Sequence, residues 1–420
     1  MLKVISFAVI LFFLLNGCRN QNSNFVQINF WGLGAEGETV QKLIPEFEKE
    51  NPHIKVKVQM IPWTAAQEKL ISSYASDNTP DASQLGNTWI PQFVQLNAIE
   101  NLTPWINQSV TVNKNNYFKG IWDTNIIDSL VYGLPWYIDT RVLFYRSDIL
   151  KNTGYNYPPR TWQELYDVSE KIVEKKEAKY AIFLPTNEWA TPVIFGLQNG
   201  AKLLKDQNSY GNFSNEKFKD PFKFLMKFYR ERLSPTGIQE VPNVYQAFAK
   251  KYIAMYISGP WNVPEFKKWM TGDLSDKWMT APLPSPNDST AGVSLAGGSS
   301  LVIFKRSDHK KEVWKLFEFL SKPEIQVKLY KLLNDLPAVK RAWGDSSLKN
   351  DPYMKAFYEQ FQHVVAAPKI PEWEQIVFSK LQQYLEFSAR GAISVNTALA
   401  DLDKDVDKIL EKRRWMLSKQ

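Results

Sequence analysis

A glycine-rich stretch near the N-terminus, Gly32 to Gly37, is the first segment of this sequence whose spacing could support chemistry. It matches the G-x-G-x-x-G pattern that holds a dinucleotide pyrophosphate, and it lies between a predicted strand and a predicted helix. Two features argue against a nucleotide. Glu36 would place a negative charge beside the pyrophosphate, and the next predicted strand ends at Met60 without the acidic residue that binds the ribose. We therefore expect no cofactor.

The other residues whose side chains could take part in chemistry form neither a metal site nor a nucleophile site. Aspartates alternate over residues 401–407 as in a calcium loop, but Val406 replaces the required glycine and Lys412 the final glutamate. The histidines have no second ligand at metal spacing: His53, His309 and His363. The stretch Gly292–Ala296 lacks the last glycine of a nucleophile elbow. No metal and no catalytic serine are expected.

Aromatic residues are the most informative feature of the chain. Fifteen tryptophans accompany 18 tyrosines and 25 phenylalanines. A pyranose ring has an apolar face and a rim of hydroxyls, so a sugar site combines flat aromatic side chains with carboxylates, amides and arginine. The tryptophans that lie near such polar residues are Trp31, Trp63, Trp89, Trp136, Trp189, Trp261, Trp343 and Trp373. Packing in the core is the alternative role for each of them.

The elements that must position these side chains alternate between strands and helices. The pattern predicts a strand over residues 25–31, a helix over 38–50 and a second strand over 54–60. A βαβ opening indicates a parallel sheet and an α/β fold. Capping boxes are predicted at Thr161 with Glu164 and at Ser321 with Glu324.

Length and composition limit the classes of protein that are possible. The 420 residues are enough for two lobes, each with its own core, and the apolar content of 44% can fill both. The net charge of +7 is spread along helical segments among Asp and Glu, so we expect no nucleic-acid partner. A proline-rich stretch at 281–286 followed by a glycine-rich one at 292–300 is a candidate crossing between lobes.

The N-terminus indicates export. Residues 1–17 read as a secretory signal peptide, because the apolar run after Lys3 is too short to span a membrane. The end of that run, Leu14–Cys18, resembles the lipobox of bacterial lipoproteins. Cys18, the only cysteine, would then carry the lipid and residues 18–24 would form a flexible leash. The expected location is the extracytoplasmic side of a membrane.

Several segments together resemble a known family. The most specific runs from Tyr132 to Arg146, and weaker matches occur in the same order along the chain at residues 81–93, 254–262, 297–305, 319–324 and 336–337. In this order they are similar to family 1 extracellular solute-binding proteins of bacterial ABC sugar importers, which include the maltose-binding type. The resemblance covers nearly the whole mature chain.

The resemblance implies a two-lobed periplasmic-binding-protein fold of the type II kind, with the ligand in a cleft between lobes joined by crossing strands. Residues 25–138 and 290–338 would form the first lobe, and residues 139–289 and 339–420 the second. One crossing is expected near residues 135–141.

The resemblance also implies ligand-contacting residues. Asp139 matches a family carboxylate that accepts sugar hydroxyls, Arg141 can pair with it, and Trp261 matches the stacking aromatic of the maltose-binding type. The other candidates, with Trp63 added from the aromatic pattern, are Glu36, Glu38, Asn87, Thr88, Trp89, Trp136, Glu188, Trp189, Gly298 and Ser299. Helix capping is the alternative role of Glu36 and Glu38. Either Trp343 or Trp373 can supply the aromatic that the family carries on the C-terminal side of the cleft.

We therefore predict a monomeric, non-enzymatic binding protein that captures a mono- or oligosaccharide and delivers it to an ABC permease. Another solute, a polyol or a glycerophosphodiester, is the first alternative. An extracytoplasmic glycosidase that uses Glu36 or Glu38 with Asp139 is a second, and an adhesin is a third.

Overall fold

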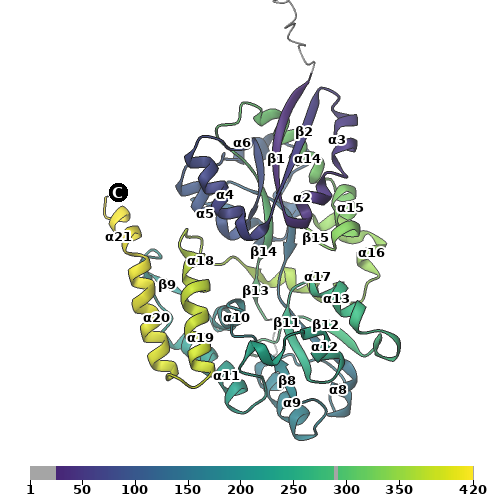
Figure 1. Ribbon diagram of the computed structural model, residues 1–420, viewed down its shortest axis with the longest axis vertical. Coiled ribbons are helices and arrows are strands. Elements are labelled where there is room, and N and C mark those ends of the chain that lie inside the picture. Colours follow the sequence, from purple (N-terminus) through teal and green to yellow (C-terminus); the bar gives the residue numbers. More distant parts are fainter. Residues whose placement is uncertain (1–24, 288–291, 420) are drawn as a thin grey trace, which may run out of the picture.

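The computed structural model describes residues 25–287 and 292–419 and confirms the predicted two-lobed α/β fold. Two sheets, each covered by helices, form an upper and a lower body (Figure 1). We call the body built on the six-stranded sheet lobe 1 and the body built on the four-stranded sheet lobe 2. The predicted signal peptide, Cys18 and the leash lie outside the described residues.

None of the helices in the described part of the chain combines the length and the apolar character of a membrane span.

Lobe 1 contains a mixed sheet with the strand order β15-β6-β14-β3-β1-β2. Strand β1 is parallel to β2 and β3, whereas β14 is antiparallel to β3 and β6, and β15 is antiparallel to β6. The strands are β1 (Val26–Leu33), β2 (Ile54–Ile61), β3 (Ala82–Gly86), β6 (Leu134–Asp139), β14 (Gly297–Ile303) and β15 (Leu336–Pro337). The C-terminal ends of the first four and the N-terminal ends of the last two therefore meet at one edge of the sheet, which faces lobe 2.

Helices cover both faces of this sheet. One face carries α2 (Gly34–Val40), α3 (Ile44–Glu50), α14 (Lys310–Leu320) and α15 (Pro323–Leu333), and the other carries α4 (Trp63–Ala75) and α5 (Ile90–Gln95). Phe30 and Phe47 are fully buried in the first layer, and Leu85 and Phe93 in the second. Shorter helices, α6 (Thr103–Gln108) and α7 (Lys119–Asp123), close the lobe.

The opening βαβ unit is confirmed with one correction. The helix expected over residues 38–50 is two helices, because the chain turns at residues 41–43 and a new helix starts at Ile44 with Pro45 in its first turn. Proline lacks an N–H and fits the first turn of a helix, where that donor has no intrahelical partner, but not the interior.

Lobe 2 is built on a sheet with the order β12-β7-β11-β8. The strands are β7 (Val142–Arg146), β8 (Tyr180–Phe183), β11 (Ile253–Ser258) and β12 (Trp278–Ala281). Strand β11 is parallel to β8 and antiparallel to β7. The surrounding helices are α8 (Ser147–Asn152), α9 (Trp162–Glu174), α10 (Ala190–Gln198), α11 (Glu216–Arg230), α12 (Val244–Ala249), α13 (Asn262–Trp269), α16 (Ser346–Lys349) and α17 (Met354–Gln360).

The C-terminal part of the chain is helical and lies along one side of the molecule (Figure 1). It consists of α18 (Trp373–Gln375), a π-helical stretch η7 (Ile376–Leu381), α19 (Gln382–Ala389), α20 (Val395–Ile409) and α21 (Glu411–Leu417). The predicted apolar stripe of the closing helix is confirmed, since Leu399, Leu402 and Val406 are fully buried.

Two of the connections between the lobes lie side by side. Thr140 and Arg141 lead from β6 to β7, and residues 295–297 lead from β13 (Ser294–Leu295) to β14. The Thr140 hydroxyl donates to the Leu295 carbonyl at 2.8 Å, and the Arg141 N–H donates to Ser294 Oγ at 3.3 Å. β13 also pairs with β16 (Val364–Val365). This arrangement suits a hinge, because the backbone changes orientation over only a few residues.

At one of the two predicted capping boxes only the cap itself forms, because the returning carboxylate bonds to the residue before Thr161. Thr161 caps α9, its hydroxyl accepts the Glu164 N–H at 3.0 Å, and the Glu164 carboxylate accepts the Arg160 N–H at 2.7 Å. The prediction at Ser321 is wrong. The residue that precedes α15 is Lys322, and the Ser321 hydroxyl donates instead to the Phe317 carbonyl of the preceding helix at 2.7 Å.

Candidate ligand-binding site

A cavity of about 380 Å³ lies between the lobes, at the edge of the lobe 1 sheet described above. Both lobes contribute to it. The structure brings nine of the predicted residues together on its walls: Trp63, Asn87, Thr88, Trp89, Asp139, Arg141, Trp189, Trp261 and Gly298. Its size is within the range of pockets that enclose small ligands.

The lobe 1 wall carries two tryptophans that follow parallel strands. Trp63 opens α4 directly after β2, and Trp89 ends the 3₁₀ turn η1 (Asn87–Trp89) directly after β3. Their rings meet edge to face with 5.6 Å between centroids. The Trp63 indole N–H donates to Glu36 Oε2 at 3.2 Å, so Glu36 fixes the orientation of that ring.

The lobe 2 wall carries more exposed aromatics. Trp261 is 48% exposed and Phe378 is 53% exposed, whereas Trp189 is partly buried and packs edge to face against Phe378. Trp261 stands where β11 gives way to α13, and its ring folds back over Gly259. A Cβ at Gly259 would lie 2.1 Å from that ring, so only glycine permits this position.

Arg141 is the cation at the centre of the site. Its guanidinium lies 3.2 Å from Asp139 Oδ1 and 3.6 Å from Glu188 Oε2, and it stacks over the Trp261 ring at 4.7 Å. Burial raises the pKa of Asp139, Arg141 acts in the opposite direction, and Glu188 adds to the rise. Arg141 therefore joins a carboxylate of lobe 1 to a carboxylate of lobe 2 and supports an aromatic face.

Direct contacts also cross the cleft. Thr88 of lobe 1 donates a hydrogen bond to Glu374 of lobe 2, on α18. Lys369 donates to the carbonyls of Asp123 and Ile126 at 3.2 and 2.6 Å, at the side of the same interface. The two lobes thus interact with each other through polar groups as well as through the connecting strands.

Three predicted tryptophans lie in the core and do not line the cavity. Trp136 is 1% exposed and packs against Phe30, because it points to the opposite side of β6 from Asp139. Trp343 is buried against Phe118, and its indole N–H donates to the Pro337 carbonyl at 2.9 Å. Trp373 is also buried and touches the cavity only indirectly, through an edge-to-face contact with Trp189.

The remaining predicted residues lie near the cavity without lining it, or away from it. Glu36 contacts Trp63, and Glu188 accepts the Ala190 N–H at 3.0 Å at the start of α10 while pairing with Arg141. Ser299 is buried in β14 next to Gly298. Glu38 is exposed on α2, one turn of helix away from the sheet edge.

Sequence reasoning missed several residues that line the cavity, chiefly Tyr137, Glu374 and Phe378. Tyr137 lies between the predicted residues Trp136 and Asp139, and strand alternation places it on the side of Asp139. Glu374 and Phe378 are four residues apart, a helical spacing that would bring both to one face beside the buried Trp373. The π-helical stretch that carries Phe378 gives no clear sequence signal, although such stretches are frequent at functional sites.

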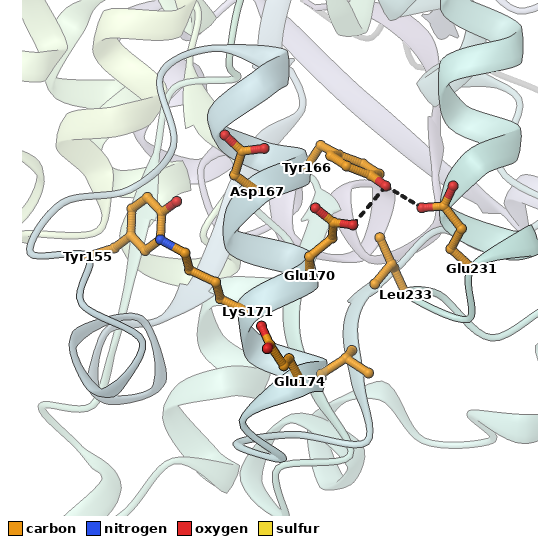
Figure 2. Close-up of a pocket in the computed structure, with 9 residues that line it drawn as sticks. Tyr155, Tyr166, Asp167, Glu170, Lys171, Glu174, Glu231 and Leu233 are labelled. Atoms are coloured by element: carbon orange, nitrogen blue, oxygen red, sulfur yellow. Dashed lines mark hydrogen bonds between the residues drawn. The ribbon is translucent and has the colours of Figure 1, made fainter.

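A larger hollow of about 730 Å³ lies on the surface of lobe 2 beside α9 (Figure 2). Tyr166 stands between Glu170 and Glu231, and its hydroxyl is hydrogen-bonded to both. The ring of Tyr155 is covered by the Lys171 ammonium group at 4.9 Å. The hollow belongs to one lobe, its walls are the charged face of a helix, and none of the predicted site residues lies in it. The cavity between the lobes is therefore the better candidate site.

No group of three or more His, Cys, Asp or Glu side chains within residues 25–287 and 292–419 could hold a metal ion. The cavity presents aromatic rings with carboxylate, amide and hydroxyl groups at their edges, which suits hydrogen bonding and stacking.

A two-lobed α/β body with aromatic and hydrogen-bonding walls facing each other across a hinge defines a solute-binding protein. Residues 31–327 match the bacterial extracellular solute-binding proteins, and the chain belongs to this family.

Known relatives extend over most of the chain. The sugar-binding protein MalE from Xanthomonas citri is 44% identical and superimposes with a TM-score of 0.91 over 94% of this chain and 100% of that one. A solute-binding protein from Thermotoga lettingae, bound to α-D-tagatose, is 27% identical with a TM-score of 0.74 over 91% and 99%. The galactooligosaccharide-binding protein of Bacillus subtilis is 24% identical over 88% of this chain and 86% of its own.

Proposed function

We propose that the protein binds a sugar in the cavity between its lobes and delivers it to the permease of a bacterial ABC importer. The observation that carries this proposal is the composition of the two walls. Trp63 and Trp89 of lobe 1 face the same cavity as Trp189 and Trp261 of lobe 2, with Asp139 and other hydrogen-bonding groups at their edges. Flat apolar surfaces next to carboxylate, amide and hydroxyl groups complement the faces and rim of a pyranose.

Binding and closure are coupled in this proposal. A sugar that contacts both walls stabilises the arrangement in which the lobes approach each other, and this closed form is the one that the permease recognises. The hydrogen bond between Thr88 and Glu374 supports the same state, because it also requires the two lobes to be close. No bond of the sugar is broken in this cycle, and the names of the relatives above likewise describe binding proteins.

Lipidation of Cys18 and residence on the extracytoplasmic side of the membrane complete the proposal. A monomeric body on a leash from Cys18 to Asn24 could reach its permease while it remains attached to the membrane. Labelling of cells with a radioactive fatty acid, compared between the wild type and Cys18→Ala, tests this part. Incorporation of label into the variant would contradict it.

Thermal unfolding of the purified mature protein against maltose, tagatose, galactobiose and diacetylchitobiose tests the binding function. A sugar at 100 times its dissociation constant adds about 2.7 kcal/mol to the free energy of unfolding, which is a readable shift of the midpoint. Trp261→Ala should abolish the shift, and Trp415→Ala, which removes an exposed tryptophan on α21, should not. No shift with any sugar would contradict a sugar ligand and favour a polyol or a glycerophosphodiester.

Absence of turnover is tested separately. The protein should release no chromophore from nitrophenyl glycosides, whatever their linkage. Release that is lost in Asp139→Asn would favour the glycosidase alternative instead.

A further inference from the structure

A hollow at a third connection between the lobes lies away from the interlobe cavity. Residues 338–345 lead from β15 of lobe 1 to α16 of lobe 2 and include a 3₁₀ turn, η5 (Lys340–Gly344). The hollow has a volume of about 670 Å³ and is bounded by η5, α16 and α17, so we call it the η5 hollow. Among the described residues, none lines both this hollow and the interlobe cavity. Figure 1 shows α16 on the opposite side of the molecule from α18, whose Glu374 lines that cavity.

The wall of the η5 hollow carries an aromatic ring that is both exposed and held in place. Tyr358 on α17 is 43% exposed. Its ring centroid lies 5.4 Å from that of Trp343 on η5 and 5.7 Å from that of Phe118, just before α7. Because both partner rings are buried, Tyr358 is fixed on one side and open on the other. Leu348 and Met354 close the floor with apolar side chains.

The rim of the η5 hollow is positively charged. Its lysines are Lys340, Lys349 and Lys355. None of them forms an ion pair with an Asp or Glu in the part of the chain that the structure describes, because the acids nearby are engaged elsewhere. Asp345 pairs with Lys331 at 3.3 Å, and Asp351 pairs with Lys267 at 2.6 Å. With Glu359 as the one carboxylate among the described lining residues, three lysines and one glutamate give the lining a net charge of +2.

One of these lysines is already positioned. The Lys340 ammonium group lies over the Phe118 ring at 5.6 Å and donates to the Asn115 carbonyl at 3.4 Å. A partly buried ammonium group held over an aromatic ring has less water around it, which strengthens its attraction for an anion. Lys349 ends α16 and Lys355 lies in the first turn of α17, and both are exposed, so their long side chains can reach a ligand in the hollow.

We propose that the η5 hollow is a second ligand site, which binds a small anion that carries an apolar ring or chain. The anionic group lies among the three lysines, and the apolar part packs against the ring of Tyr358. The site goes beyond the proposed function and does not depend on it, because it uses other residues and another chemical class of ligand.

Other classes of ligand fit this lining less well. The net positive charge repels a cation. Lysine ammonium groups only donate hydrogen bonds, whereas a sugar hydroxyl is both a donor and an acceptor. An inorganic anion would leave the Tyr358 ring uncovered. The volume lies in the range of pockets that enclose small organic molecules, so a carboxylate or phosphate on an aromatic or aliphatic group uses both parts of the hollow.

Titration of the purified mature protein with phenyl phosphate at low ionic strength tests the site. The proton and phosphorus NMR signals of the probe report binding. Inorganic phosphate and benzyl alcohol are the matched probes, since the first keeps only the anion and the second only the ring. Phenyl phosphate should bind with a dissociation constant of about 1 mM or below, and the other two at least about tenfold more weakly.

Two variants locate the binding. The double variant Lys349→Glu, Lys355→Glu reverses two charges that face the anion and should weaken phenyl phosphate binding about tenfold or more. Gly344→Phe should weaken it as well, because its larger side chain takes up part of the hollow. A Cβ at Gly344 meets no atom within 4 Å, and its φ is not positive, so this substitution is compatible with the fold.

Lys223→Glu is the matched control, since Lys223 is an exposed lysine on α11 that does not line the hollow. It should bind phenyl phosphate like the wild type. The inference is overturned if the wild type does not bind phenyl phosphate at about 10 mM, or if the double variant binds it unchanged. Displacement of phenyl phosphate by a bound sugar would place it in the interlobe cavity and also overturn the inference. A wild type that binds phenyl phosphate but no sugar would refute the proposed function alone.

Discussion

Arg141 offers the sharpest test of how the site is held together. Its side chain and that of Asp139 are 17% and 20% exposed, so the pair is largely but not fully desolvated. Arg141→Met keeps the aliphatic stem that packs near Trp261 and removes the charge. Exposed ion pairs contribute about 0–1 kcal/mol to the free energy of unfolding, and loss of one partner of a buried pair costs about 3–5 kcal/mol. Because this pair lies between the two cases, we expect Arg141→Met to lower the free energy of unfolding by about 2 kcal/mol at pH 8.

The loss should depend on pH with a defined sign. Without Arg141, the pKa of Asp139 rises further, since burial and Glu188 already raise it and Arg141 is the group that opposes them. A carboxyl whose pKa is higher in the folded than in the unfolded state stabilises the fold at low pH and loses that contribution as the pH rises through the folded-state pKa. The deficit of Arg141→Met relative to the wild type should therefore be small at pH 4 and full at pH 8.

Urea unfolding of both proteins at pH 4 and pH 8 measures this difference. Arg390→Met is the control, because Arg390 is 47% exposed in a surface pair with Glu386 and should change the free energy of unfolding by less than about 0.5 kcal/mol. The double variant Asp139→Asn, Arg141→Met should recover most of the loss, since no buried charge is then left unpaired. Equal losses at both pH values, or no recovery in the double variant, would refute the electrostatic account and assign the effect to packing.

Other residues give further predictions. Phe378→Ala should weaken sugar binding about tenfold with little change in stability, because its ring is 53% exposed at the cavity. Trp136→Ala should instead lower the free energy of unfolding by about 3–5 kcal/mol, because its ring is buried in the core. Calorimetry measures the first effect and urea unfolding the second. Thr88→Val removes the hydrogen bond to Glu374, so small-angle scattering of the unliganded protein should show a larger radius of gyration than the wild type, and an unchanged radius would count against a contribution to closure. Asp335→Asn should become more stable relative to the wild type as the pH rises from about 4 to about 8 and level off above it, since the folded-state pKa of about 8 lies above the unfolded one, and parallel stability curves would contradict this.

Much of the site could be predicted because it follows the parallel strands. Glu36, Trp63 and Asn87 come just after β1, β2 and β3, and Trp189 and Trp261 open the helices that follow β8 and β11. The C-terminal ends of parallel strands meet at one edge of a sheet, which is where ligands bind in open α/β folds. The family resemblance identified most of these positions, and their place after the strands explains why they meet at one site.

The predictions failed where burial depends on tertiary contacts. Trp343 and Trp373 have polar neighbours in the sequence, yet one packs in the core of lobe 1 and the other in that of lobe 2. Local composition cannot distinguish such a residue from Trp261, whose exposure depends on the turn at Gly259. The break at residues 41–43 had a sequence signal in Pro45, which was overlooked because the apolar pattern continues across it.

Strand β14 shows what strand direction adds to such reasoning. It is antiparallel to β3 and β6 and brings its N-terminal end to the edge where those strands end, so residues just before it and at its start reach the cavity. Ala296 precedes β14 and Gly298 is its second residue, and both line the cavity although they are more than 150 residues away from Tyr137 in sequence. The recognition surface of lobe 1 is thus assembled from both chain directions, and the residues that return to the sheet after the chain has crossed to lobe 2 are the ones that can couple ligand contact to the hinge.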